Sequence, residues 1–139
     1  MANFDISQKV LLEDEGLWSN DAEDSGGETC WGIARKIDTK WSGWAIVDQY
    51  KQKPNFPNNL NNPEIKNLVN TFYKINYWAK IKGDEINNQD IATQIYKSYV
   101  NTGSEGIILA QRALSIRESG IMDDATLSAL NNEKTQNNA

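Results

Sequence analysis

The sequence contains no histidine, and Cys30 is its one cysteine among 139 residues. Without histidine there can be no Ser-His-Asp or Cys-His catalytic centre, and zinc sites built from histidine or several cysteines are excluded as well. A single cysteine cannot form a disulfide within the chain. Carboxyl, hydroxyl, amide and aromatic groups are what remain for chemistry, and we expect neither a metal nor an organic cofactor.

Basic clusters and long apolar runs are also missing. The 14 Lys and Arg residues are outnumbered by 19 Asp and Glu, so the formal net charge is −5. This balance argues against a nucleic-acid partner. No apolar run approaches the roughly 20 residues of a membrane-spanning helix, and the N-terminus lacks the basic-then-apolar pattern of a signal peptide. We therefore expect synthesis in the cytoplasm and no stable membrane insertion.

Apolar residues at helical spacing dominate the chain, and its length fits a single domain. We predict a helix over 5–15, with Asp5 as its N-cap and Gly16 as its stop, and then a small β-hairpin within 17–33. Further helices are predicted over 41–52, 63–79, 89–101 and 104–114, and after Asp123. In the helix over 63–79 the predicted apolar stripe consists of Ile65, Leu68, Val69, Phe72, Ile75 and either Trp78 or Ala79. The fold class is mainly α (α+β), with a flexible tail over 132–139.

The densest group of carboxylates lies around the end of the first predicted helix. Glu13, Asp14 and Glu15 occupy its last turn, where the helix dipole disfavours negative charge. A partly buried Glu at such a place should have a raised pKa, as a general acid near neutral pH requires. The spacing does not decide which of the three is the acid. Asp24, in the turn region, is the candidate second carboxylate across a substrate cleft. A carboxyl separation of about 6.5–9.5 Å would suit inversion, and about 5–5.5 Å retention.

Several segments of the sequence resemble glycoside hydrolase family 108, a family of bacterial and phage N-acetylmuramidases. The first block consists of E-G-L-W-S-N-D at 15–21, D-S-G-G-E-T at 24–29 and G-I at 32–33. Later segments, at 73–78, 100–103 and 111–114, are similar to the family's Y-x-x-x-Y-W, V-N-x-G and Q-R-A-L patterns. The resemblance implies one lysozyme-like, two-lobed helical domain over 1–139. Residues 115–131 would then form a degenerate peptidoglycan-binding-like segment.

The resemblance also implies roles for individual residues. Glu15 would be the catalytic acid, and Asp24 and Thr29 would help to place or activate a water. Trp18 is the best candidate for stacking on a sugar ring because it lies beside Glu15 in the sequence. Asn101 is a candidate partner for an N-acetyl group. The candidate substrate-binding residues are Trp18, Asn20, Gly26, Gly27, Tyr77 and Asn101.

The implied activity is hydrolysis of the β-1,4 bond between N-acetylmuramic acid and N-acetylglucosamine in peptidoglycan. We expect a monomer that reaches the cell wall after holin- or lysis-dependent release. Its cleft would have the helix over 5–15 and the hairpin as one wall, and the helices over 63–79, 89–101 and 104–114 as the other.

Two other functions stay open. A lytic transglycosylase would use the same glutamate and form a 1,6-anhydro sugar. The other is a non-catalytic protein that binds peptidoglycan or a partner. It stays open because Leu17 and Lys97 replace a glycine and an acidic residue of the family pattern.

Overall fold

The computed structural model describes residues 1–21 and 27–132, which fall into two compact units. One unit spans residues 11–73, and the other combines residues 1–10 with the chain from Lys74 onward. Six α-helices and three short strands occur in the described residues, which confirms the predicted α+β class. The first helix, α1 (Phe4–Glu15), contributes residues to both units.

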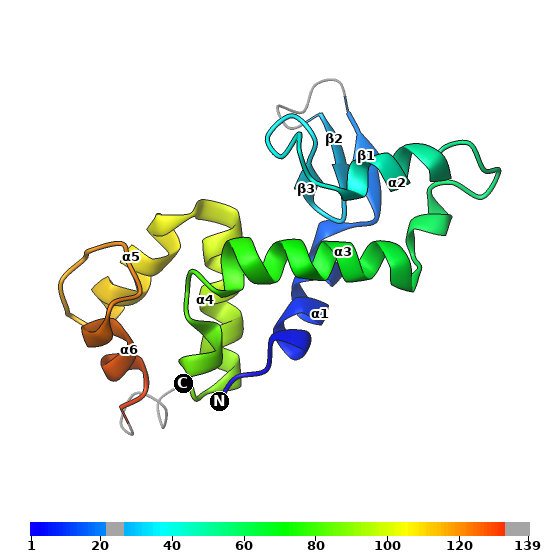
Figure 1. Cartoon of the computed structure of the whole chain (residues 1–139). Helices are drawn as coiled ribbons and strands as arrows, with labels where there is room; N and C mark the ends of the chain where they lie inside the picture. Colours follow the sequence, from blue (N-terminus) through cyan, green and yellow to red (C-terminus); the bar gives the residue numbers. More distant parts are fainter. Residues whose placement is uncertain (22–26, 133–139) are drawn as a thin grey trace. The chain divides into compact units, whose positions relative to one another are not determined.

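The unit over 11–73 contains the small sheet. The strands β1 (Trp18–Asn20), β2 (Glu28–Cys30) and β3 (Ile33–Ala34) pair antiparallel in chain order, so the predicted hairpin is present and gains a third strand. The helix α2 (Gly43–Tyr50) lies beside the sheet (Figure 1). A 3₁₀ turn, η1 (Asn58–Leu60), then leads to α3 (Pro63–Tyr73). The start of α3 at Pro63 is confirmed, because Asn62 Oδ1 accepts a hydrogen bond from Ile65 N at 3.1 Å.

A π-helical turn, η2 (Lys74–Trp78), continues α3 and changes the predicted apolar stripe. A π turn inserts an extra residue, which rotates every later side chain about the helix axis. The buried positions are accordingly Ile65, Val69, Tyr73 and Trp78, whereas Ile75 is 62% exposed. The prediction that the stripe runs through Ile75 is therefore wrong.

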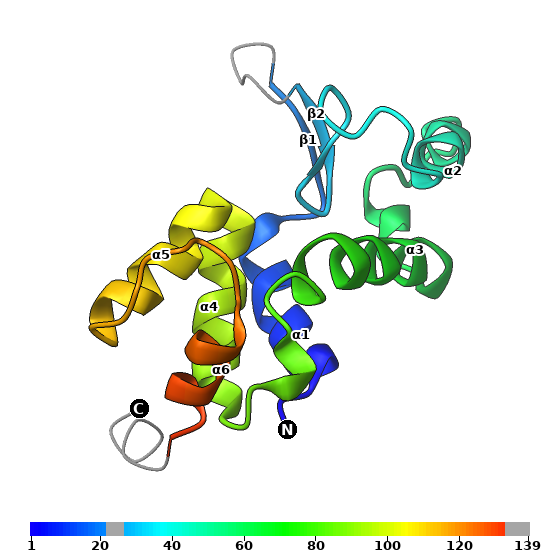
Figure 2. The same ribbon diagram turned by 60° about the vertical axis from the view of Figure 1, so that its left-hand side comes forward.

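The other unit is helical in its described part. It contains the 3₁₀ turn η3 (Gly83–Glu85) and the helices α4 (Gln89–Thr102), α5 (Ser104–Ala113) and α6 (Asp124–Leu130), of which α4 and α5 pack together (Figure 2). Its core includes three aromatic rings that meet edge to face. The ring centroids of Phe4 and Trp78 are 5.6 Å apart, and those of Trp78 and Tyr96 are 5.4 Å apart. Asp123 caps α6 as predicted, since its side chain accepts from Thr126 N.

The predicted cap of α1 is wrong by two residues. The helix begins at Phe4, and Asn3 Oδ1 accepts from Asp5 N at 2.8 Å, so Asn3 supplies the capping oxygen. Gln8 is buried and accepts a hydrogen bond from the Tyr96 hydroxyl. The tertiary partner of Gln8 comes from α4, which local sequence cannot reveal.

The grouping of helices also differs from the prediction. The helix over 63–79 was expected to join α4 and α5, but its residues up to Tyr73 belong to the unit of the sheet. After α5, the buried Gln111 amide donates to Ser119 Oγ, Ile121 O and Thr126 Oγ1 at 2.9–3.0 Å. These bonds tie residues 115–131 to α5. In the part of the chain that the structure describes, no helix is long and apolar enough to cross a membrane.

Candidate active site

Glu15 is the last residue of α1, and the structure distinguishes it from the two carboxylates before it. Glu13 and Asp14 are exposed, whereas Glu15 is half-buried. Burial, and secondarily the negative charge of Asp14, raise the pKa of the Glu15 carboxyl. Its side chain forms no hydrogen bond or ion pair with another described residue. A carboxyl in this setting retains its proton to higher pH than an exposed one.

Gly32 forms the surface against which the Glu15 carboxyl lies. A Cβ atom added to Gly32 would be 2.7 Å from Glu15 Oε2 and 2.6 Å from the Tyr73 hydroxyl oxygen. Both oxygens therefore lie over the face of the backbone that glycine leaves uncovered. Gly32 also has a φ of +85°, which favours glycine for a second reason. A side chain at position 32 would displace the carboxyl.

Trp31 and Gly32 form the two-residue connection between β2 and β3. Cys30 pairs with Ile33, so the two residues between them make a tight hairpin turn. Both have positive φ, +47° for Trp31 and +85° for Gly32, as a type I′ turn requires. A bulky residue in this region costs about 1–2 kcal/mol. The sequence thus accepts a backbone conformation that tryptophan disfavours.

Hydrogen bonds to three parts of the unit hold Trp31 in this conformation. Its amide donates to Leu17 O at 3.0 Å, and its indole Nε1 donates to Leu60 O at 3.2 Å. Its own carbonyl accepts from the Tyr73 hydroxyl at 2.7 Å. At roughly 0.5–1.5 kcal/mol for each hydrogen bond, the three together offset the conformational cost.

The strand register separates two of the predicted site residues. Trp18 pairs with Cys30, and Ser19 pairs with Thr29. Because neighbouring residues of a strand point to opposite faces, Trp18 and Thr29 lie on opposite faces of the sheet. The Thr29 hydroxyl is 3.1 Å from the Ser19 hydroxyl on its face. Trp18 packs edge to face against Phe56, with ring centroids 4.9 Å apart.

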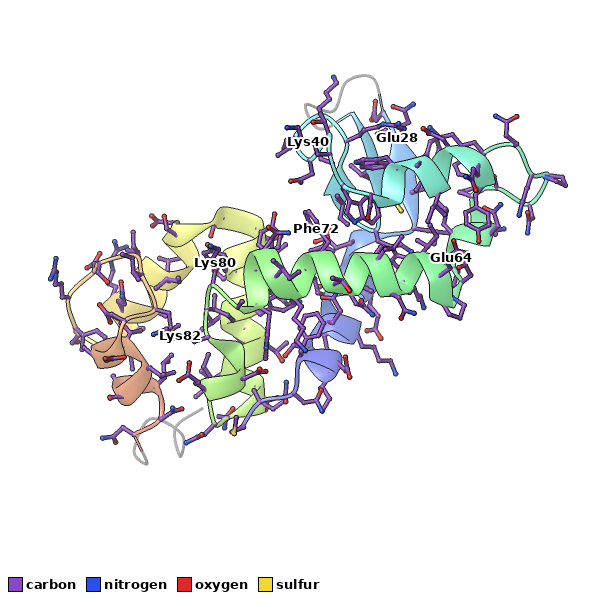
Figure 3. The ribbon with its side chains drawn as sticks, in the orientation of Figure 1. Glu28, Lys40, Glu64, Phe72, Lys80 and Lys82 are labelled. Atoms are coloured by element: carbon purple, nitrogen blue, oxygen red, sulfur yellow. The ribbon has the colours of Figure 1, made fainter. Side chains whose placement is uncertain are left out.

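Glu28, labelled in Figure 3, is the second carboxylate of this unit with an unusual environment. Lys51 Nζ lies 2.5 Å from Glu28 Oε2, Trp18 Nε1 donates to the same oxygen at 2.8 Å, and Arg35 Nη1 lies 3.0 Å from Oε1. Burial alone would raise the pKa of Glu28, but the bonds from Lys51, Trp18 and Arg35 outweigh it and lower the pKa. Arg35 also forms a bidentate pair with Asp48, both distances being 2.7 Å. The contacts of Glu28 thus favour its ionised form.

The remaining predicted residues lie in several places. Asn20 is exposed at the end of β1, and Gly27 is buried, with a φ of +62°. Tyr77 and Asn101 belong to the other unit: Tyr77 meets Tyr99 edge to face, and Asn101 is exposed on α4. Asp24 and Gly26 lie outside the described residues. Within residues 1–21 and 27–132, no group of three or more His, Cys, Asp or Glu side chains could hold a metal ion.

Two residues found beside the Glu15 carboxyl are not among the predicted site residues. Gly32 and Tyr73 each belong to a segment that resembles the family, G-I at 32–33 and Y-x-x-x-Y-W at 73–78. Their presence in these patterns was the available signal. Nothing in their spacing along the chain indicates that they meet at one carboxyl.

Glu15 and Glu28 have opposite environments, the first suited to proton donation and the second to ion pairing. Glu15 has a raised pKa and no described charged partner except its neighbour Asp14, whose charge opposes ionisation. Glu28 has cationic partners and a lowered pKa. Environments that push the pKa values of two carboxyls apart are how one fold assigns them different roles.

Comparison with known proteins gives matches to solved structures and to one protein family. The structure is similar to that of Brucella abortus SagA, with a TM-score of 0.65 and 19% sequence identity over 95% of this chain and 70% of that one. At this identity the similarity establishes the fold, which is lysozyme-like as predicted. No curated protein sequence matches the chain. Residues 8–103, well over half of the sequence, match the family described as Glycosyl hydrolase 108. The chain therefore belongs to glycosyl hydrolase family 108.

Proposed function

We propose that this chain is an N-acetylmuramidase that cleaves the β-1,4 bond between N-acetylmuramic acid and N-acetylglucosamine, with Glu15 as the general acid. Its family makes it a glycoside hydrolase, and at family level a peptidoglycan hydrolase. The observation that supports Glu15 is its half-buried carboxyl, whose pKa is raised and which has no ion-pair partner among the described residues. Glycoside hydrolysis requires such a protonated carboxyl beside the leaving oxygen.

The proposed reaction begins with proton transfer from the Glu15 carboxyl to the glycosidic oxygen. The bond between that oxygen and the anomeric carbon breaks, and a water attacks the carbon and passes a proton to the Asp24 carboxylate. We assign the water to Asp24 and Thr29, on the basis of the family resemblance. Thr29 has a hydroxyl on the opposite face from Trp18 and near Ser19.

Trp18 has a weaker case as a sugar platform than its position in the sequence suggested. Its indole N–H is bonded to Glu28, and its ring packs on Phe56. Asn20 and Asn101 are both exposed, as contacts to a sugar require. The partner in this proposal is the glycan strand of peptidoglycan, and the place of action is therefore the cell wall.

Mass spectrometry of the products from purified peptidoglycan tests the proposal. The comparison uses the wild type, Glu15→Gln and Glu13→Gln. Glu13 is the matched control because it is exposed on the same helix, two residues earlier. We expect N-acetylmuramic acid reducing ends from the wild type and from Glu13→Gln, and a loss of at least about 100-fold in Glu15→Gln.

Other products would point to other functions. 1,6-Anhydro ends from the wild type would identify a lytic transglycosylase. No soluble product over pH ~4–8, around the carboxylate range, would favour a glycan-binding protein. Full activity of Glu15→Gln would refute the assignment of the acid.

A further inference from the structure

The turn at Trp31 and Gly32 contacts a second side chain, Tyr73, in addition to the proposed acid. The Glu15 carboxyl and the Tyr73 hydroxyl approach the same uncovered face of Gly32, each within 3 Å of the point where a Cβ would lie. These two side chains come from α1 and α3, and the turn comes from the sheet. Three separate elements therefore meet at the carboxyl.

The direction of the Tyr73 proton follows from its partner. Tyr73 lies 2.7 Å from the carbonyl oxygen of Trp31, and a carbonyl oxygen can only accept. The hydroxyl has one proton, so that proton points at Trp31 and not at Glu15. The ring of Tyr73 is 2% exposed, which keeps it in this position. Tyr73 thus contributes no proton to stabilise a Glu15 carboxylate.

We propose that Tyr73 is a positioning residue, which fastens the Trp31–Gly32 turn and thereby holds the Glu15 carboxyl against Gly32. The inference rests on the proposed function, since it assigns a purpose to the geometry around the acid. Tyr73 acts through the turn: it fixes the carbonyl of Trp31, and the next residue in the chain is the one that contacts Glu15. Its own proton is directed away from the carboxyl, so the protonated acid is the form that this geometry favours.

Removing the hydroxyl would loosen the turn while leaving the aromatic ring in place. Tyr73→Phe takes away one of the three hydrogen bonds that hold Trp31 at positive φ. The turn can then move off Glu15 and expose the carboxyl to water. Among the residues that the structure describes, the titratable groups beside Glu15 are Asp14 on α1 and Tyr73 on α3, and the turn presents backbone. Since burial is the main cause of the raised pKa of Glu15, that pKa should fall in the variant.

A carbon-13 NMR titration of the side-chain carboxyls measures this effect directly. Glu15→Gln identifies the Glu15 resonance. We expect a lower Glu15 pKa in Tyr73→Phe than in the wild type. Tyr50→Phe is the matched control, because it removes a hydroxyl bonded to Glu64 at 3.4 Å elsewhere in the same unit. An unchanged Glu15 pKa in folded Tyr73→Phe would overturn the proposal.

Steady-state kinetics on peptidoglycan fragments test the same variants in a second way. A misplaced acid should lower kcat about tenfold at neutral pH with little change in KM. The basic limb of the kcat profile should move to lower pH. A smaller fraction of folded protein would lower kcat at every pH and leave the pH of the basic limb unchanged. The position of that limb therefore distinguishes a positioning role for Tyr73 from a purely structural one.

Two measurements that leave Tyr73 in place test the contact between Glu15 and Gly32, on which the proposal depends, if Tyr73→Phe does not fold. The backbone amide of Gly32 should titrate with the same midpoint as the Glu15 carboxyl, and this titration should vanish in Glu15→Gln. A Gly32 amide that is insensitive to Glu15 would refute the contact. Neither measurement needs turnover. A wild type that cleaves no peptidoglycan would refute the proposed function, and the NMR titrations would still decide whether Gly32 contacts the Glu15 carboxyl.

Discussion

The contact between Glu15 and Gly32 can be tested by adding a single methyl group. Gly32→Ala introduces a Cβ that would lie 2.7 Å from Glu15 Oε2 and 2.6 Å from the Tyr73 hydroxyl. Contacts this short force the carboxyl, the hydroxyl or the turn to move. The substitution therefore perturbs the position of the acid and the stability of the fold at once.

The free-energy cost has two parts, and the chain offers a control for one of them. Alanine at positive φ costs about 1–2 kcal/mol, and Gly16→Ala has this cost alone, because its φ is +77° and nothing lies within 4 Å of its added Cβ. Overpacking at Gly32 adds about 1–3 kcal/mol. We therefore expect a loss of about 2–5 kcal/mol for Gly32→Ala and about 1–2 kcal/mol for Gly16→Ala.

Urea denaturation followed by tryptophan fluorescence measures the difference. Of the five tryptophans, Trp78 alone lies outside residues 11–73, so the signal reports mainly on the unit that contains Gly32. With a slope of about 1–3 kcal/mol/M, each kcal/mol moves the midpoint by about 0.3–1 M. Equal midpoints for the two alanine variants would show that the added methyl meets no resistance, and the described contact would be wrong.

Two further predictions concern the opposed glutamates. Glu28→Gln should lower the free energy of unfolding by about 2 kcal/mol at neutral pH, since it removes the charge that Lys51 and Arg35 contact. The folded-state pKa of Glu28 is lowered, so its contribution is present above the ordinary Glu pKa and is lost on acidification; denaturation midpoints that stay apart at low pH would contradict this. Glu15→Gln should instead stabilise the protein at neutral pH. The folded-state pKa of Glu15 is raised, so ionising it costs stability as pH rises through that value. Thermal melting of the wild type and Glu15→Gln at pH 4 and pH 7 tests this. A variant less stable than the wild type at pH 7 would contradict the prediction.

Local signals in the sequence predicted the boundaries of several elements correctly. Asn62 caps α3, Asp123 caps α6, and Gly16 ends α1 with a φ of +77°. In each case the capping group and the backbone that it serves lie within a few residues of each other. Such interactions depend little on the rest of the fold, which is why the pattern alone was sufficient.

Features that change when a helix or strand shifts by one residue could not be predicted from local signals. The π turn after Tyr73 takes Ile75 out of the buried stripe and keeps Trp78 in it. Likewise, the pairing of Ser19 with Thr29 decides which face of the sheet Thr29 occupies. A shift of one residue would exchange the faces, and the sequence of so short a hairpin is compatible with either register.

The partners of Glu28 show why a catalytic carboxyl is hard to select from sequence. Glu15 and Glu28 are the same residue type, and both lie in the block that resembles the family. Arg35 and Lys51 form ion pairs with Glu28. Arg35 directly follows β3 in the chain, and Lys51 directly follows α2. Glu15 packs on glycine backbone and has no described cationic partner.

The difference between an acid and a structural ion is therefore decided by groups distant in the chain. Burial raises the pKa of either carboxyl, and the presence or absence of a cation determines the net direction. For Glu28 the cations outweigh burial, and for Glu15 burial acts unopposed, with Asp14 adding to it. A fold that excluded water from Glu15 but placed a lysine beside it would produce a second ion pair and no proton donor. What makes Glu15 the better candidate for the acid is thus the bare backbone of Gly32 together with the Tyr73 proton directed at Trp31.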